Sequence, residues 1–134
     1  GNYAIFHYMF ESSILNDSQL YKYDFEDFMG SEDWEKMFVH KIIKTKSGNC
    51  HGLPYYYKIL ADEIGVESHL ALAPNHMYIK HLDENNHWVN VELTNGSISS
   101  DAWLITSLGI STEAIKSGIY MDPLSEEQSV ALCV

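Results

Sequence analysis

Positively charged side chains are scarce in this sequence. Its 134 residues include 8 lysines and arginines against 19 aspartates and glutamates, which gives a formal net charge of -11 at pH 7 and a pI near 4.8. Phosphate backbones and anionic membrane surfaces are repelled by such a charge. We therefore predict that the protein does not bind nucleic acid.

Long apolar runs and cysteines are also few. No apolar stretch approaches the ~18 residues of a membrane-spanning helix, so no membrane insertion is predicted for this segment. The two cysteines, Cys50 and Cys133, are too few for a disulfide framework. Pairing in an oxidising compartment would remove the free thiol of Cys50, so the compartment is left open, as is the oligomeric state.

The remaining composition is that of one folded domain. Hydrophobic residues make up 46% and charged residues 20%, which is typical of a globular chain with a core of its own. We divide the chain into a helical N-terminal part (1–46), a core (47–96) and a C-terminal part (97–134). An apolar pattern stops within a predicted helix at the end, so we expect the natural protein to continue.

Two helices are predicted before the middle of the chain. The first runs from Ser31, its N-cap, to Lys46, after a loop over residues 11–30. The second runs from about Cys50 to Ile64, with Asn49 as its N-cap. Its apolar stripe, on which Cys50 also falls, consists of Leu53, Tyr57, Leu60 and Ile64.

The hydrophobic period then changes to two, which indicates strands. Residues 66–73, 76–82 and 87–94 fit three strands, with a turn at 83–86. Residues 101–108 fit a strand or a helix, and 111–118 and 125–133 fit short capped helices. This order predicts an α+β fold in which helices pack on an antiparallel β-meander sheet.

Cys50 is the first candidate for chemistry, because it stands at the start of a predicted helix. The positive end of the helix dipole and nearby N–H groups lower the pKa of a thiol in that position. The same N–H groups can bind the oxyanion that forms in acyl transfer. A buried structural cysteine on the apolar stripe is the competing interpretation.

Two strand residues are candidates to act with Cys50. Counting outward from the turn places His76 opposite residue 92 or 93, where Glu92 can orient the imidazole and stabilise its charged form. Asn90, two residues away on the same strand face, is the competing orienting residue, because a neutral amide can also fill this role.

Seven histidines raise the question of a metal site. His76 and His81 point to opposite faces of their strand because their separation is odd. No CxxC, HxH or HExxH spacing occurs. We therefore expect no metal ion and no cofactor.

The stretch from Gly48 to Gly96, a little over a third of the chain, resembles the core of the transglutaminase-like superfamily, including its bacterial branch. Gly48-Asn49-Cys50 resembles the family's Gly-x-Cys at the head of the catalytic helix, and Pro74-Asn75-His76 falls where the family places its catalytic His. Residues 88–94, WVNVELT, resemble its Trp-x-x-x-Asp-Pro-Thr strand. Here Glu92 replaces Asp, Leu93 replaces Pro, and His51 replaces the Trp of many relatives.

The resemblance implies a papain-like fold and cysteine-dependent acyl transfer. Cys50 would be the nucleophile, His76 its base, and Glu92 (or Asn90) the orienting group. Further residues expected at the cleft are Asn49, His51, Asn75, Tyr78 and Trp88. The implied substrate is a protein or peptide amide, with hydrolysis favoured over transamidation by analogy with bacterial members. The alternative is an inactive domain that serves as a peptide- or protein-binding module.

Overall fold

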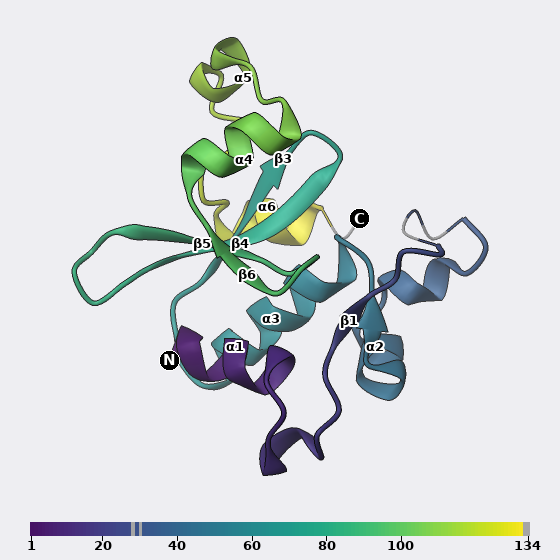
Figure 1. Ribbon diagram of the computed structural model, residues 1–134. Coiled ribbons are helices and arrows are strands. Elements are labelled where there is room, and N and C mark those ends of the chain that lie inside the picture. The colour runs from purple at the N-terminus through teal and green to yellow at the C-terminus, as the bar shows by residue number, and fades with distance from the viewer. Residues whose placement is uncertain (28, 30, 133–134) are drawn as a thin grey trace.

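Figure 1 shows the computed structural model, which describes residues 1–27, 29 and 31–132. The fold is α+β, and its antiparallel sheet lies between helices that precede and follow it in the chain. The elements in chain order are α1 (Asn2–Phe10), the 3-10 helix η1 (Ile14–Asn16), β1 (Lys22–Tyr23), the 3-10 helix η2 (Trp34–Met37), α2 (Val39–Thr45), β2 (Ser47–Gly48), α3 (Gly52–Glu63), β3 (His69–Ala73), β4 (His76–Leu82), β5 (Trp88–Glu92), β6 (Ser97–Ser99), α4 (Asp101–Leu108), α5 (Thr112–Lys116) and α6 (Glu126–Ala131).

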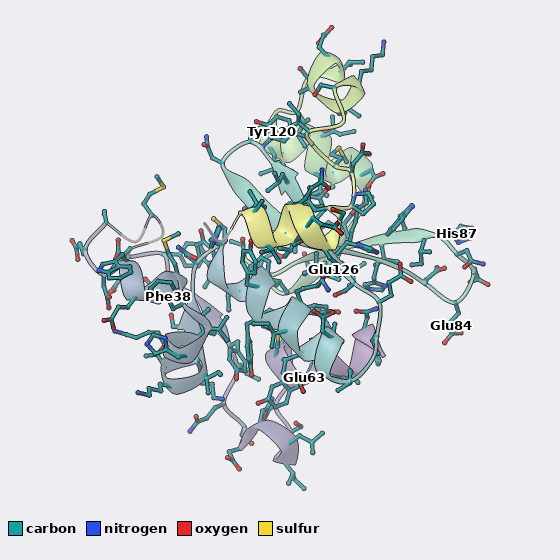
Figure 2. All side chains as sticks on the ribbon, turned by 180° about the vertical axis from the view of Figure 1, so that it is seen from behind. Phe38, Glu63, Glu84, His87, Tyr120 and Glu126 are labelled. Atoms are coloured by element: carbon teal, nitrogen blue, oxygen red, sulfur yellow. The ribbon has the colours of Figure 1, made fainter. Side chains whose placement is uncertain are left out.

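Strands β3 to β6 form an antiparallel meander in the order β3-β4-β5-β6. The three predicted strands correspond to β3, β4 and β5. The hairpin between β4 and β5 extends away from the body of the molecule, with Glu84 and His87 near its tip (Figure 2). Strand β6 is not predicted, because it is a short polar segment. It follows a turn in which Gly96 adopts a φ of +62° and Phe10 lies 2.8 Å from the position of an added Cβ.

Helix α3 packs on one face of this sheet and forms the main core with β3 and β4. Leu53, Tyr57 and Ala61, spaced four residues apart, are fully buried in this core. The predicted stripe is correct at Leu53 and Tyr57. It is wrong at its end, where Leu60 is partly buried and Ile64 is exposed. The reason is that the buried face continues from Tyr57 to Ala61, four residues on, rather than to Leu60, three residues on.

Helix α4 covers the opposite face of the sheet (Figure 1). Alternate strand residues such as Ala71 and Tyr78 face it and are buried with Leu104. Residues 101–108 are therefore a helix rather than a strand. The cap explains this outcome, because the Ser100 hydroxyl accepts the Trp103 N–H at 3.2 Å.

Helices α5 and α6 confirm the short capped helices predicted at these positions, with Ser111 and Ser125 as N-caps. Helix α6 is held against α3, as the view from behind shows (Figure 2). Lys58 Nζ lies 2.9 Å from Glu126 Oε1, and the Tyr55 hydroxyl donates to the carbonyl of residue 129 at 2.7 Å. Cys133 lies outside the described residues.

The predicted helix from Ser31 to Lys46 is wrong, since this segment contains η2 and α2 with an extended residue, Phe38, between them. The N–H groups of residues 31–33 donate to the Asp27 carboxylate, which holds this stretch in a loop. The helical part therefore starts later. Asp33, rather than Ser31, caps η2 by accepting the Glu35 N–H at 3.1 Å.

The predicted loop over residues 11–30 contains η1 and strand β1. Strand β1 pairs in parallel with β2, which immediately precedes the Cys50 segment. The Lys22 N–H donates to the Lys46 carbonyl at 2.8 Å, and the Asp24 N–H donates to the Gly48 carbonyl at 2.9 Å. This small second sheet attaches the N-terminal part to the start of α3.

No helix among the described residues has the length and apolar character to cross a membrane.

Candidate active site

Cys50 lies between β2 and α3, in a segment whose backbone is closely confined. A Cβ on Gly48 would lie 2.9 Å from the Ile42 side chain, so only glycine fits there without displacement. The Asn49 carboxamide oxygen accepts the N–H groups of His51 at 3.1 Å and Gly52 at 2.8 Å. Asn49 thus performs the predicted capping, although α3 begins at Gly52 rather than at Cys50.

The Cys50 thiol is partly buried and contacts two polar side chains, the His76 imidazole and the Tyr23 hydroxyl. Burial is the largest influence on its pKa and opposes ionisation. Hydrogen bonds to His76 and Tyr23, together with the charge of His76, outweigh burial and lower the pKa of Cys50 below its ordinary value. The environment of Cys50 therefore favours the thiolate.

His76 and Glu92 form a buried ion pair at the end of the sheet where β4 begins and β5 ends. His76 Nε2 lies 2.6 Å from Glu92 Oε2, and Glu92 Oε1 accepts the Thr94 N–H at 2.9 Å. Burial, the largest influence, lowers the pKa of His76, but the contacts with Cys50 and Glu92 raise it to about 9. Burial raises the pKa of Glu92, but the hydrogen bond and charge of His76 lower it by more. The net pKa of Glu92 is therefore below its ordinary value, and the carboxylate form prevails.

The lowered pKa of Cys50 and the raised pKa of His76 both favour transfer of the thiol proton to the imidazole, which gives a thiolate–imidazolium pair. Because Glu92 engages Nε2 of His76, Nδ1 is the ring nitrogen left for the thiol of Cys50. The three side chains thus form a continuous chain from sulfur to carboxylate. Such a chain can generate a nucleophile, take up its proton and stabilise the resulting positive charge.

The predicted strand register is off by one or two residues. Ile79 pairs with Val91, and continuing this register places His76 opposite Thr94 and Glu92 opposite Tyr78. His76 and Glu92 meet as diagonal neighbours on the same face, which is within reach of long side chains. Their contact therefore depends on the length of Glu92.

Asn90, the competing orienting residue, does not contact His76. Its amide group donates to Asp101 Oδ1 at 2.6 Å and to the Ser99 carbonyl at 3.2 Å. It is fully buried between β6 and the start of α4. The geometry therefore places Glu92, and not Asn90, beside the imidazole.

A cavity of about 320 Å³ opens beside the thiol and the imidazole. Its lining consists of Cys50, His51, Leu72, Ala73, Asn75, His76, Met77, Tyr120 and Leu132. Burial lowers the pKa of His51, so this ring is neutral at pH 7. Among the described residues of the lining, the Tyr120 phenol is the one ionisable group besides Cys50, His76 and neutral His51.

Two of the five predicted cleft residues, His51 and Asn75, line this cavity, and the other three do not. Asn49 is buried beneath the Cys50 segment as its cap. Tyr78 is fully buried in the core under α4, and burial raises the pKa of its phenol. Trp88 is at the far end of β5 and packs edge-on against His69, with ring centroids 5.8 Å apart.

Tyr23 is a site residue that sequence reasoning misses. Strand β1 has two residues, too few for a periodic pattern, and its partner β2 is 25 positions later. The only available signal is the aromatic-rich stretch around it, and that stretch has no regular spacing. The parallel pairing of β1 with β2 sets Tyr23 beside Gly48, two residues before Cys50.

Comparison of the chain with protein-family models, curated proteins and solved structures gave no match. Within the part of the chain that the structure describes, no three side chains of His, Cys, Asp or Glu are grouped to hold a metal ion.

Proposed function

We propose that this protein is a cysteine-dependent acyl-transfer enzyme with a transglutaminase-like, papain-like core. The observation that carries the proposal is the chain of contacts from Cys50 through His76 to Glu92, with the pKa lowered at sulfur and raised at the imidazole. A structural cysteine on an apolar stripe needs neither contact. The placement of the thiol before a helix that packs on an antiparallel sheet also supports the family resemblance.

The proposed reaction has two stages. The Cys50 thiolate attacks an amide carbonyl and forms an S–C bond, the C–N bond breaks, and His76 gives its proton to the departing amine. A water molecule then attacks the thioester, His76 accepts its proton, and the C–S bond breaks to restore the thiolate. Glu92 stabilises the imidazolium whenever His76 carries the proton.

The substrate we propose is a peptide or protein amide with an uncharged, mainly apolar side chain near the scissile bond. The cavity beside the thiol is bordered by Leu72, Ala73, Met77 and Leu132, and a volume of about 320 Å³ suits one or two side chains. The apolar part of this border favours an apolar side chain over the glutamine carboxamide as the group that enters the cavity. Hydrolysis is preferred to transamidation by analogy with bacterial members of the family.

The test is the reactivity of Cys50 towards iodoacetamide, measured against pH in a Cys133→Ser background so that one thiol reports. We expect rapid alkylation with a midpoint well below the ~8.5 of a free thiol. His76→Ala removes the hydrogen bond and the positive charge, so it should shift the midpoint upward and slow alkylation at pH 6–7.

Cys50→Ser supplies the blank, and circular dichroism checks that each variant keeps its fold. If Cys50 in the otherwise unchanged site alkylates no faster than a model thiol at the same pH, the enzyme proposal is wrong. The binding-module alternative would then be the better account.

A further inference from the structure

The stabilisation of the oxyanion is the part of the reaction that the side chains of Cys50, His76 and Glu92 do not supply. A tetrahedral intermediate places negative charge on the former carbonyl oxygen, and enzymes of this kind meet it with fixed neutral donors. The imidazolium of His76 is committed to the leaving amine. The backbone N–H of Cys50 lies near its own sulfur and can supply one donor. Oxyanion sites place at least one further donor beside it.

The Tyr23 hydroxyl is placed to be such a donor, because the pairing of β1 with β2 sets Tyr23 opposite Gly48 and its hydroxyl interacts with the Cys50 thiol. Its position is set by backbone pairing on both sides, from the Lys22 N–H to the Lys46 carbonyl at 2.8 Å and from the Asp24 N–H to the Gly48 carbonyl at 2.9 Å. The ring packs against the main core and against Phe25, with ring centroids 4.8 Å apart. A donor held in this way is oriented before the substrate arrives.

The hydroxyl also keeps its proton beside a thiolate. Burial is the largest influence on the phenol and raises the pKa of Tyr23, and the negative charges of Cys50 and Glu92 raise it further. The thiol therefore ionises first, and Tyr23 remains a neutral donor over the working pH range. A neutral donor needs no charge compensation when the oxyanion forms.

We propose that the Tyr23 hydroxyl holds the Cys50 thiolate at rest and then donates to the oxyanion during acyl transfer. This inference rests on the proposed function of Cys50 and adds a residue from the N-terminal part of the chain, outside the stretch that resembles the family. In the first step the substrate carbonyl carbon bonds to sulfur, and the electron pair of the C=O bond moves to oxygen. The hydroxyl then donates to that oxygen in place of the sulfur, and no proton is transferred.

Two reactions of the same thiolate separate these roles. Alkylation by iodoacetamide displaces iodide and forms no oxyanion, whereas acylation by p-nitrophenyl acetate passes through one and releases p-nitrophenolate. Both are measured across pH in the full chain carrying Cys133→Ser, with and without Tyr23→Phe. Removing one oxyanion donor costs up to ~100–1,000-fold in well-organised sites, and we expect ~10–100-fold for one hydroxyl.

The expected result for Tyr23→Phe is an upward shift in the alkylation midpoint and, above that midpoint, unchanged or faster alkylation. Acylation above the midpoint should fall ~10–100-fold. Equal losses in both reactions would reduce Tyr23 to a partner of the resting thiolate, and no loss in either would overturn both roles. If Cys50 is unreactive in the parent protein, the proposed function fails first, and the two failures are distinguishable.

Tyr21→Phe is the matched control. Tyr21 lies two residues earlier and its hydroxyl bonds to the Tyr56 hydroxyl at 2.8 Å and to Lys46 at 2.8 Å. Its loss removes a tyrosine hydroxyl from the same region and should lower stability without changing the ratio of acylation to alkylation. If Tyr23→Phe does not fold, Tyr23→Met gives the same comparison, because Met fills similar space without a hydrogen-bond donor. The Tyr23 ring borders an open hollow of about 840 Å³, so the flexible Met side chain has room to adjust.

Discussion

Replacing Glu92 by Gln tests how much of the site depends on the buried carboxylate. Gln keeps the shape and an oxygen that can accept the Thr94 N–H, but it removes the negative charge 2.6 Å from His76 Nε2. The rise of the His76 pKa from 6.5 to about 9 corresponds to about 3 kcal/mol, supplied by Cys50 and Glu92 against the cost of burial. A hydrogen bond to a charged group contributes about 1.5–3 kcal/mol. We therefore expect the pKa of His76 to fall by about 1–2 units in Glu92→Gln.

The assay is an NMR titration of the His76 ring together with the pH profile of Cys50 alkylation. In Glu92→Gln the imidazolium should deprotonate well below pH 9, and hydrolysis should fall because the positive charge that accompanies the thiolate is less stable. Asn90→Ala is the control, because Asn90 bonds to Asp101 and Ser99 and should change stability but not the His76 titration. An unchanged His76 pKa in Glu92→Gln, or an equal shift in Asn90→Ala, would refute this reasoning.

Three further outcomes are expected. Gly48→Ala places a Cβ 2.9 Å from Ile42 and should lower the free energy of unfolding by ~1–3 kcal/mol in denaturant titrations, without a change in the intrinsic thiolate reactivity of the folded fraction. Tyr120→Asp places a negative charge at the cavity and should shift preference from apolar to lysine-containing peptide substrates, which competition assays with paired peptides measure. The pKa of His76 is raised by Cys50 and by Glu92, and Cys50→Ser leaves only the Glu92 contribution. The stability that His76 contributes in Cys50→Ser should be fully present below pH 6.5 and lost as the pH rises through a folded-state pKa that is lower than in the parent protein, which urea titrations across this window would detect.

Much of the sheet and of α3 follows from local sequence. The change of period after Gly65 predicts β3, β4 and β5, and Asn49 before an apolar stripe predicts the start of α3 to within two residues. These features depend on neighbours along the chain, which is why a single sequence reveals them. The proximity of His76 and Glu92 also follows, because one hairpin connects their strands.

The parts that sequence reasoning misses depend on distant contacts. The Asp27 carboxylate interrupts the expected first helix by binding three N–H groups that a helix would leave unpaired, and no periodic pattern records this. Tyr23 reaches the thiol only because β1 pairs with β2. Tyr78 is buried because α4 covers its face of the sheet, a packing choice set by residues that follow the strands.

The length of residue 92 leads to a last prediction, which runs against the family resemblance. Relatives of the proposed family carry Asp at the position of Glu92, so the resemblance alone predicts that Glu92→Asp restores a better site. In this register Glu92 lies opposite Tyr78 and only diagonally from His76, and the carboxylate reaches Nε2 at 2.6 Å. Removing one methylene should draw it beyond the ~3.2 Å limit of a good hydrogen bond.

We therefore expect Glu92→Asp to behave like Glu92→Gln, with a lower His76 pKa and slower hydrolysis, although it keeps the charge. The NMR titration of His76 measures the first effect, and the hydrolysis rate of one peptide substrate, compared between Glu92→Asp and the parent protein, measures the second. Thermal unfolding shows whether the fold is intact. A gain in activity would mean that β5 shifts in register to bring residue 92 opposite His76, and that the longer side chain is not what completes this site. A loss would show that the extra methylene compensates for the diagonal register, so that register and side-chain length are matched in this protein.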